Sequence, residues 1–334
     1  MPNFTKRHIV ELLKETNPEN IAELYRQADR VRQEQVGPTV HLRGLIEFSS
    51  FCRKDCLYCG LRRSNGRLQR YRMSLEEIFA AAENARLLGF KTVVLQSGED
   101  SHYSLDDFCS LVARIKKELR VAVTLCIGER TREEYARLKE AGADRYLIRF
   151  ETSDPDLFAR MKPDSTYENR FRCLQDLREL GYQVGSGNLV GLPGQSLESL
   201  ADDILKFREL ELDMVGLGPF ICNPDTPLYG FANSTLDMVL RMTALTRIVT
   251  ENAHIPATTA TGTLDETGRQ QALSCGANVI MPNLTPPEYR KLYQLYPDKI
   301  CLNEDPGQCK TCVTGMIAGL GRTVALDRGD SLRI

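Results

Sequence analysis

Three cysteines within eight positions are the first residues of this sequence that could do chemistry. Cys52, Cys56 and Cys59 stand in the stretch FCRKDCLYCG, with three and then two residues between them. Thiolate sulfur is a soft ligand that suits zinc, copper(I) and iron–sulfur clusters. The spacing therefore predicts a metal centre on one short loop, with a redox CxxC pair or simple core cysteines as the ordinary alternatives.

This loop offers three thiols, whereas a structural zinc site usually takes four protein ligands. Residues 50–73 contain no histidine and no fourth cysteine. Clusters that only transfer electrons normally take four cysteines as well. A 4Fe–4S cluster held by three cysteines would keep one iron free, so the loop predicts a cluster that binds a further ligand.

The elements that must position this loop are eight predicted strands separated by helical patterns. Runs of β-branched, apolar or small residues place the strands at 43–49, 91–98, 121–128, 145–152, 183–191, 214–220, 257–263 and 277–283. Capping-box spacings mark three helix starts, at Ser74–Glu77, Thr131–Glu134 and Thr285–Glu288. Two further helical patterns, 5–15 and 18–35, precede the first strand.

Strands that alternate with helices favour a parallel sheet, because each return to the same direction needs a crossover. Eight such units close a (βα)8 barrel, and a doubly wound open sheet is the competing architecture. No G-x-G-x-x-G follows the first strand, so the dinucleotide-binding form of that open sheet gains no support. We predict an α/β fold with one TIM-type barrel over 41–298, an N-terminal helical extension over 1–40 and a C-terminal cysteine-containing segment over 299–334. The cysteine loop then lies at the carboxyl ends of the strands, where such barrels hold their active sites.

Composition limits the class of protein. The 334 residues include 43 Lys or Arg and 45 Asp or Glu, and the net charge of −2 indicates neither a nucleic acid nor a membrane as partner. Charged residues interrupt the apolar positions of the N-terminal segment, which predicts no signal peptide or membrane span. Eleven cysteines without an export signal indicate a reducing compartment, so we expect a cytoplasmic protein.

The motif CRKDCLYC resembles the CxxxCxΦC signature of the radical S-adenosylmethionine (SAM) superfamily, with Tyr58 at the aromatic position. The resemblance implies a 4Fe–4S cluster on Cys52, Cys56 and Cys59, whose open iron chelates SAM. It also implies that one electron from the cluster cleaves SAM to methionine and a 5′-deoxyadenosyl radical.

The same resemblance implies SAM contacts at the ends of the predicted strands. The stretch SGED (97–100) is similar to the motif that contacts the SAM amino group, through Gly98 and Glu99, with Gln96 just before it. Glu151 and Arg170 would hold the methionine end of SAM, with a structural ion pair between them as the alternative. GNLVGLPGQ (187–195) resembles the adenosine-contacting segment and contributes Leu192.

Longer segments resemble HydE, a family of radical SAM maturases that help build the active-site cluster of FeFe hydrogenase. The match extends over about residues 40–315 and includes CRKDCLYCGLRR, VLQSGED, NLVGLPGQ, DMVGLGPF and CGANVIMPN. It implies an organometallic substrate inside the barrel, an iron–cysteine complex with carbonyl and cyanide ligands, and other hydrogenase maturases as partners. Residues that could hold this anionic complex are Arg43, Asp225, Thr258, Thr259, Tyr293 and Tyr296, although buried threonines and tyrosines often only pack and Arg43 could serve an internal ion pair.

A second group of three cysteines, Cys301, Cys309 and Cys312, has the spacing C-x7-C-x2-C and again no histidine nearby. Soft thiolates without nitrogen ligands favour an accessory iron–sulfur cluster, either 2Fe–2S or 4Fe–4S. An absent cluster or adventitious zinc is the alternative.

The loop 53–72 is strongly basic, with Asp55 as its one acidic residue. Its cations are Arg53, Lys54, Arg62, Arg63, Arg67, Arg70 and Arg72. A solvated basic face is the ordinary interpretation. Beside a cluster, such a face would also steer an acidic, low-potential electron donor such as flavodoxin or ferredoxin.

Two other functions stay open at this point. A HydE-like enzyme that acts on another small substrate, such as methylornithine synthase, would share the SAM-binding residues. A non-catalytic iron–sulfur scaffold would need none of them, so Gly98, Glu99, Glu151 and Arg170 count against it. Biotin synthase would need cysteines on the second and fifth predicted strands, which hold none.

Overall fold

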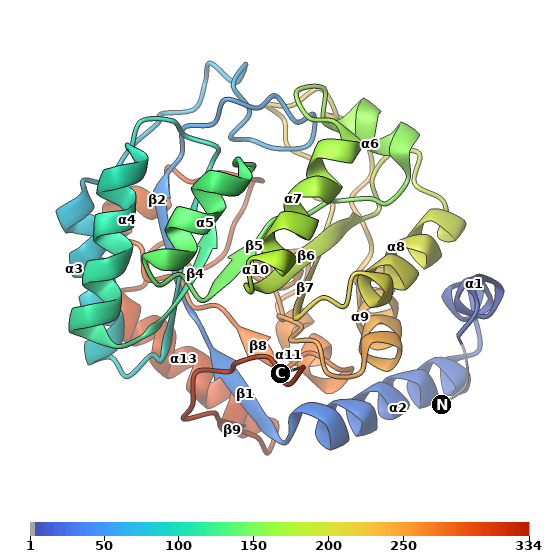
Figure 1. Cartoon of the computed structure of the whole chain (residues 1–334). Coiled ribbons are helices and arrows are strands. Elements are labelled where there is room, and N and C mark those ends of the chain that lie inside the picture. The colour runs from blue at the N-terminus through green and yellow to red at the C-terminus, as the bar shows by residue number, and fades with distance from the viewer. Residues whose placement is uncertain (1–3, 334) are drawn as a thin grey trace.

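The computed structural model describes residues 4–333 and confirms the expected α/β fold with a parallel sheet. Its six-stranded sheet runs in chain order through β2 (Gly44–Ser49), β3 (Thr92–Ser97), β4 (Ala122–Cys126), β5 (Arg145–Leu147), β6 (Gln183–Val190) and β7 (Met214–Pro219). Every neighbouring pair is parallel, because the chain crosses back through a helix between strands. Figure 1 shows these helices outside the strands.

The outer helices begin largely where the sequence predicts. They are α3 (Leu75–Leu87), α4 (Leu105–Arg114) with a π-helical turn at Ile115–Leu119, α5 (Arg132–Glu140), α6 (Pro155–Met161), α7 (Tyr167–Glu179), α8 (Leu197–Glu209) and α9 (Leu236–Thr250). The capping boxes at Ser74 and Thr131 are confirmed, each with its reciprocal glutamate. The third is wrong: α12 (Pro287–Arg290) begins without a side-chain cap, because the Thr285 hydroxyl accepts from the buried Glu47 N–H instead.

A second, three-stranded parallel sheet has the order β8 (Val279–Ile280), β1 (Thr39–Leu42), β9 (Thr323–Val324). The strand predicted at 257–263 is wrong. Thr258 caps the helix α10 (Thr259–Leu264), since a threonine suits a helix N-cap as well as a strand. The extended backbone lies slightly earlier, where His254 bridges to β7 and Pro256 to β8.

The regular strands of residues 4–333 do not form a closed barrel. Between β7 and β2 the pairing continues only through isolated parallel bridges, Met214–His254, Pro256–Val279 and Leu45–Asn283. These segments are too short to build a ladder of their own, so the structure shows an open six-stranded sheet with bridges between its edges.

Two helices precede the first strand, where the sequence predicts helical patterns at 5–15 and 18–35. These are α1 (Lys6–Lys14) and α2 (Pro18–Val36), which pack on α8 and α9 respectively. Both lie on the outside of the molecule in Figure 1, where α2 runs along the lower edge to the start of β1. None of the described helices is both long and apolar enough to cross a bilayer.

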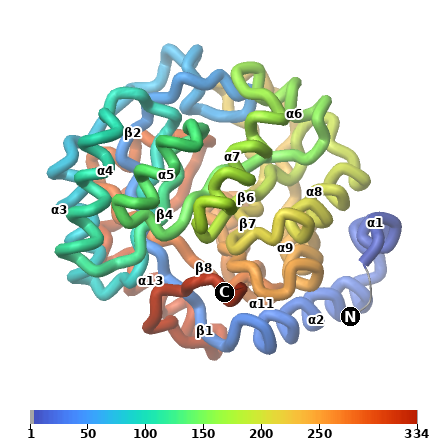
Figure 2. Tube along the Cα trace, viewed as in Figure 1, coloured from blue at the N-terminus to red at the C-terminus, as the bar shows by residue number. Residues whose placement is uncertain are grey.

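The chain after β8 folds back over the strands. It contains α12, α13 (Pro306–Gly319) and β9, and ends in a stretch that we call the C-terminal strap, residues 325–333. The strap contacts the amino ends of the strands: Thr92 and Arg145 donate to the Arg328 carbonyl, and Arg43 donates to that of Gly329. In Figure 2 the C-terminus accordingly lies away from the blue loop that follows β2.

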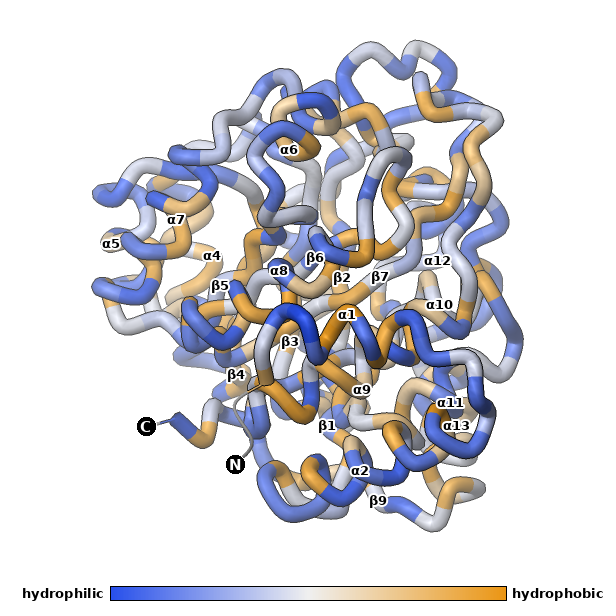
Figure 3. Tube along the Cα trace, turned by 90° about the vertical axis from the view of Figure 1, so that its right-hand side faces the viewer, coloured by the Kyte–Doolittle hydropathy of each residue, from blue (hydrophilic) through white to orange (hydrophobic). Residues whose placement is uncertain are grey.

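The core lies between the strands and the outer helices. Val93, Leu95, Val123 and Leu125 of β3 and β4 are completely buried. In Figure 3 the outer helices carry mixed hydropathy along their length, as amphipathic helices on a core do.

Candidate functional site

The cysteine loop leaves the carboxyl end of β2, as predicted. Cys52, Cys56 and Cys59 are free thiols, each partly buried. Two long-range backbone hydrogen bonds fix the loop, from Leu57 N to Met161 O and from Gly60 N to Leu295 O, both 2.9 Å. The position of the three thiols therefore depends on α6 and on the segment after α12.

Hydrogen-bond donors lie beside two of the three thiols. The Glu99 N–H lies 3.4 Å from Cys52 Sγ, and Lys162 Nζ lies 3.6 Å from Cys56 Sγ. Burial raises the pKa of the Cys52 and Cys59 thiols, so metal binding has to displace their protons. N–H and ammonium donors stabilise the resulting thiolates.

The donor set fits an iron–sulfur cluster. Thiolate sulfur is the ligand that holds such clusters, and the loop supplies three thiols within eight positions. The N–H and ammonium donors beside Cys52 and Cys56 would stabilise the bound thiolates. Within residues 4–333 no three His, Cys, Asp or Glu side chains are gathered closely enough to hold a single metal ion.

Two glycines bring β3 and β4 close to the cysteine loop. A Cβ on Gly98 would overlap the Phe51 carbonyl oxygen and lie 2.7 Å from Cys52 Cβ. Gly128 has φ of +82°, and a Cβ there would overlap the Glu99 side chain. Only glycine allows this close approach, which places the Glu99 carboxylate beside the loop.

Glu99 and Glu129 form a buried acidic pair above the loop. Glu99 Oε1 accepts from Glu129 N at 3.1 Å, and its Oε2 lies 3.3 Å from Arg53 Nε. The Glu129 carboxylate accepts from Lys54 Nζ at 2.9 Å and from Arg170 Nε at 3.0 Å. Burial works to raise the pKa of Glu129, but Arg170 and Lys54 outweigh it and hold that pKa below its usual value.

Sequence reasoning missed Glu129. The signal available was its place in the stretch GER, directly after the strand predicted at 121–128. A carboxylate at the carboxyl end of a parallel strand belongs to the face that holds the site.

Glu151 and Arg170 are both buried, but the ion pair considered between them does not form. Arg170 pairs with Glu129 and also donates to the Arg149 carbonyl at 2.7 Å. Glu151, at φ of +70°, lies 3.1 Å from an Arg149 nitrogen, yet the same oxygen has no partner with hydrogen-bond geometry. Its carboxylate is therefore available to a ligand.

Tyr58 and Leu192 meet in a small apolar cluster beside the loop. Its buried members are Leu157, Met161, Leu192, Phe220 and Leu228, with Tyr58 and Cys222 packed against it. The Tyr58 hydroxyl accepts from Lys162 Nζ at 3.1 Å. This wall has the apolar character that a flat ring system requires.

A cavity of about 170 Å³ lies among the inward-facing side chains of the strands. Of the predicted site residues, it is lined by Arg43, Gln96, Thr258, Thr259 and Tyr296. Tyr293 is buried beside it and accepts from Gln96 Nε2 at 3.4 Å. Asp225 is not among them: it lies in a surface pocket, 3.1 Å from Arg67 Nη1.

The charges around this cavity are mainly positive. Its lining includes Arg43, Arg149 and Lys299 against one carboxylate, Glu47, which is fully paired with Lys299 at 2.5 and 2.8 Å. Arg43 is buried without a carboxylate among the described residues, and it donates to Met214 Sδ at 2.7 Å and to Gly329 O at 3.1 Å. The internal ion pair considered for Arg43 is therefore absent within 4–333.

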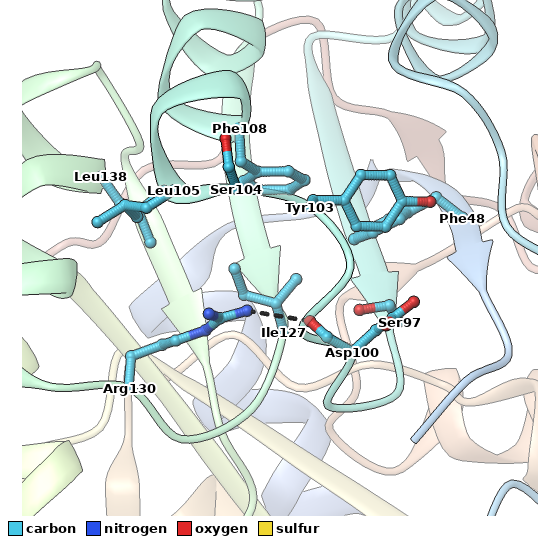
Figure 4. Close-up of a pocket in the computed structure, with 10 residues that line it drawn as sticks. All are labelled: Phe48, Ser97, Asp100, Tyr103, Ser104, Leu105, Phe108, Ile127, Arg130 and Leu138. Carbon is cyan, nitrogen blue, oxygen red and sulfur yellow. Dashed lines mark hydrogen bonds between the residues drawn. The ribbon is translucent and has the colours of Figure 1, made fainter. Parts of the chain in front are cut away.

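A smaller cavity, of about 10 Å³, lies behind β3 and next to α4 (Figure 4). Phe48, Tyr103 and Phe108 form much of its wall, and Arg130 reaches the Asp100 carbonyl at 3.5 Å. A space of this size holds at most one water. It belongs to the packing under the site and excludes a substrate.

The second group of cysteines lies around the start of α13. Cys309 is buried, Cys312 is exposed, and Cys301 is partly buried at φ of +63°. The neighbouring Cys309 thiol lowers the pKa of Cys301 to about 6, and Arg269 contributes. Arg290 is buried nearby with one guanidinium nitrogen unpartnered. These two arginines, which the sequence did not single out, make the place suitable for an anionic group.

The basic loop is less available than its composition suggests. Lys54, Arg62, Arg70 and Arg72 are committed to internal carboxylates or carbonyls. The side chains of Arg53, Arg63 and Arg67 remain 60, 61 and 82% exposed. A partner could therefore contact three of the seven cations.

The family model of the radical SAM superfamily matches residues 46–226, which is more than half of the chain. The chain is 51% identical over 331 residues to the FeFe hydrogenase maturase subunit HydE of Thermotoga maritima, covering 99% of this chain and 95% of that one. It therefore belongs to the radical SAM superfamily and, within it, to the HydE family. The resemblance seen in the sequence is confirmed, and membership makes this an iron–sulfur enzyme with a 4Fe–4S cluster and SAM as cofactors.

Methylornithine synthases are more distant relatives. The 3-methylornithine synthase of Methanosarcina acetivorans is 28% identical over 80% of this chain and 76% of its own. A crystal structure of methylornithine synthase superposes with a TM-score of 0.85 at 27% identity, over 96% of this chain and 94% of that one. The fold is thus shared with that enzyme, while the sequence is far nearer to HydE.

Proposed function

We propose that this chain is a HydE-type maturase that cleaves SAM and acts on an anionic organometallic complex in assembly of the FeFe hydrogenase cluster. The observation that carries the substrate class is the central cavity, which Arg43 and Arg149 line. Among its described lining residues the one carboxylate, Glu47, is neutralised by Lys299. Arg149 pairs with Glu151, whereas Arg43 has no carboxylate partner among the described residues. A buried cation without such a partner favours an anionic occupant. An iron–cysteine complex with carbonyl and cyanide ligands has that charge.

In this proposal Cys52, Cys56 and Cys59 hold the 4Fe–4S cluster. When bound, the cluster supplies the electron that cleaves SAM to methionine and a 5′-deoxyadenosyl radical. Glu99 and Glu151 would bind the SAM amino group and Arg170 its carboxylate, beside the approach that Gly98 permits. Tyr58 and Leu192 would wall the adenosine and exclude water.

The substrate would occupy the 170 Å³ cavity between Arg43, Gln96, Thr258, Thr259 and Tyr296, with Tyr293 behind Gln96. Threonine hydroxyls and arginine nitrogens are donors that suit cyanide and carboxylate ligands. Asp225 would act outside this cavity, at the surface beside Arg67.

The proposal extends to an accessory iron–sulfur cluster on Cys301, Cys309 and Cys312. Its support is that the Cys301 and Cys309 thiols lie within hydrogen-bond reach of each other, and that the positively charged Arg269 and Arg290 lie close to them. Thiolates and sulfides are anionic, so nearby guanidinium groups stabilise a cluster there.

Electrons would come from an acidic, low-potential donor such as flavodoxin or ferredoxin. The exposed Arg53, Arg63 and Arg67 lie on the cysteine loop and support docking by charge. Other hydrogenase maturases would deliver or receive the complex. Eleven free thiols in the chain support a cytoplasmic location.

The proposed architecture is a single barrel over 41–298 with the extension 1–40 and the segment 299–334. Its support is the set of bridges through His254, Pro256 and Asn283, which continue the parallel pairing from β7 to β2. A barrel of eight parallel units would enclose the cavity described above.

The test is anaerobic. The cluster is reconstituted, SAM and dithionite are added, and 5′-deoxyadenosine is quantified for wild type, Cys56→Ala and the control Cys109→Ala on α4. We expect product from wild type and control only, with stimulation by an iron–cysteine carbonyl–cyanide complex. Stimulation by lysine instead would identify a methylornithine-synthase-like enzyme. Intact cluster without any deoxyadenosine would contradict the enzyme proposal and leave a scaffold.

A further inference from the structure

Glu129 connects three parts of the chain that the proposed SAM site needs together. It lies three residues after the end of β4, and its carboxylate contacts Lys54 of the cysteine loop and Arg170 of α7. The partners are 75 and 41 residues away along the chain. No other described carboxylate contacts both the cysteine loop and α7 through ion pairs.

These contacts are short, and the side chains that make them are shielded from solvent. Lys54 Nζ lies 2.9 Å from one Glu129 oxygen, and two Arg170 nitrogens lie 3.0 and 2.9 Å from the other. The three side chains are only 13, 6 and 5% exposed for Lys54, Glu129 and Arg170. Buried charges of this kind hold their positions firmly, because separation would leave each of them unpaired.

The position of Lys54 in the sequence also ties it to the thiols of the cysteine loop. It stands between Cys52 and Cys56, so any shift of Lys54 moves the backbone that carries both thiols. The Glu129 N–H in addition donates to Glu99 Oε1 at 3.1 Å, which orients the carboxylate proposed for the SAM amino group. One residue thus fixes the loop, Glu99 and Arg170 relative to one another.

We infer that Glu129 is a positioning residue that sets the distance between the cluster loop and Arg170, and hence the affinity for SAM. The inference rests on the SAM contacts proposed above. In this role Glu129 would act through Lys54 and Arg170, the two residues with which its carboxylate forms ion pairs. It also balances the charge of Lys54 and Arg170, two cations that would otherwise repel both each other and the sulfonium of SAM.

The test compares cluster content with SAM binding in Glu129→Gln, which keeps the shape and removes the charge. Glu133→Gln is the matched control, because Glu133 is an exposed glutamate on the neighbouring α5. After anaerobic reconstitution, iron and sulfide per chain are measured. Equilibrium dialysis with labelled SAM then gives the Kd of the loaded protein, and the electron paramagnetic resonance spectrum of the reduced cluster is recorded with and without SAM.

We expect Glu129→Gln to load iron like wild type and to bind SAM at least tenfold more weakly. Its reduced-cluster spectrum should not change at a SAM concentration that saturates wild type. Lys54→Ala should weaken SAM binding similarly, and the double variant by less than the product of the two effects, since both act through one link.

A merely structural role would lower iron content and melting temperature together and leave the Kd of the loaded fraction unchanged. That result, or a wild-type Kd in Glu129→Gln, would overturn the inference. If wild type itself bound no SAM, the proposed function would fail instead, so the two failures are distinguishable.

Discussion

At the level of single residues, the contact between β3 and the cysteine loop depends on the absence of a side chain at Gly98. The nearest atoms to a Cβ there belong to the backbone of Phe51 and to Cys52 Cβ. Backbone and Cβ atoms cannot swing away as the end of a long side chain can. The distance between β3 and Cys52 is therefore set by the glycine.

The substitution Gly98→Ala should displace the cysteine loop and reduce iron incorporation. The added methyl has to push backbone apart, at a cost of about 1–3 kcal/mol. Iron and sulfide per chain after reconstitution, together with the melting temperature, measure the effect. Gly66→Ala is the control on the same loop, because no atom lies within 4 Å of a Cβ there. Wild-type iron incorporation and SAM binding in Gly98→Ala would contradict this expectation, because the loop would then accommodate the added methyl group.

At the level of elements, α8 is tied to two strand ends of the site by Asp203. One carboxylate oxygen accepts from Ser153 N and Oγ at 2.6 Å each, and the other accepts from Asn188 Nδ2 at 2.8 Å. Ser153 lies two residues after Glu151, and Asn188 of β6 forms a parallel bridge with Glu151. A single helix residue thus fixes both segments proposed to contact SAM.

Burial raises the pKa of Asp203 to about 7, which makes stability depend on pH. The folded chain binds the Asp203 carboxyl proton more tightly than the unfolded chain does. The stabilisation that this proton provides is therefore complete below about pH 4 and is lost as the pH rises through 7. Asp203→Asn removes the titration. We expect the free energy of unfolding of wild type to fall relative to that of the variant by roughly 2–3 kcal/mol between pH 5 and 8.

Chemical denaturation of both proteins at several pH values under reducing conditions measures this difference. Asp202→Asn is the matched control, since Asp202 is a half-exposed neighbour on α8 that pairs with Lys6. A difference between wild type and Asp203→Asn that stayed constant across this range would contradict the expectation.

At the level of the whole molecule, the C-terminal strap joins the amino ends of strands that are far apart in sequence. Asp330 accepts from Arg145 at 2.6 Å and from Gln183 at 2.9 Å, and His254 lies 3.1 Å from the Asp330 carbonyl. Arg43 and His254 line the central cavity and also contact the strap. The strap therefore covers the end of the cavity that lies away from the cysteine loop.

Asp330→Asn should lower the stability of the whole fold, because Arg145 is completely buried and would lose its carboxylate. Since Asp330 itself is 38% exposed, we expect a loss of about 1–3 kcal/mol, less than for a fully buried pair. Denaturation in urea at pH 7 measures it. Asp327→Asn, a change at a more exposed position of the same strap, should have little effect. Equal stability of the two variants would argue against a closing role for the strap.

Local features of this protein were predictable from sequence. The cysteine loop, the glycine of SGED and the capping boxes at Ser74 and Thr131 each depend on residues a few positions apart, and the structure has all of them. Where one residue type serves two local structures, prediction failed. The threonines at 257–263 suit a strand by composition, yet Thr258 caps a helix.

What the sequence by itself determined is thus the family, the cysteine loop and the alternation of strands and helices, because these depend on short spacings. Only the tertiary structure decided that Arg170 pairs with Glu129 and not with Glu151, that Asp225 lies outside the central cavity, and that the strap reaches Arg43 and Arg145. The physical reason is that a charge pairs with whichever opposite charge packing brings within reach. That choice depends on how the strands and helices assemble, over separations that no local pattern records.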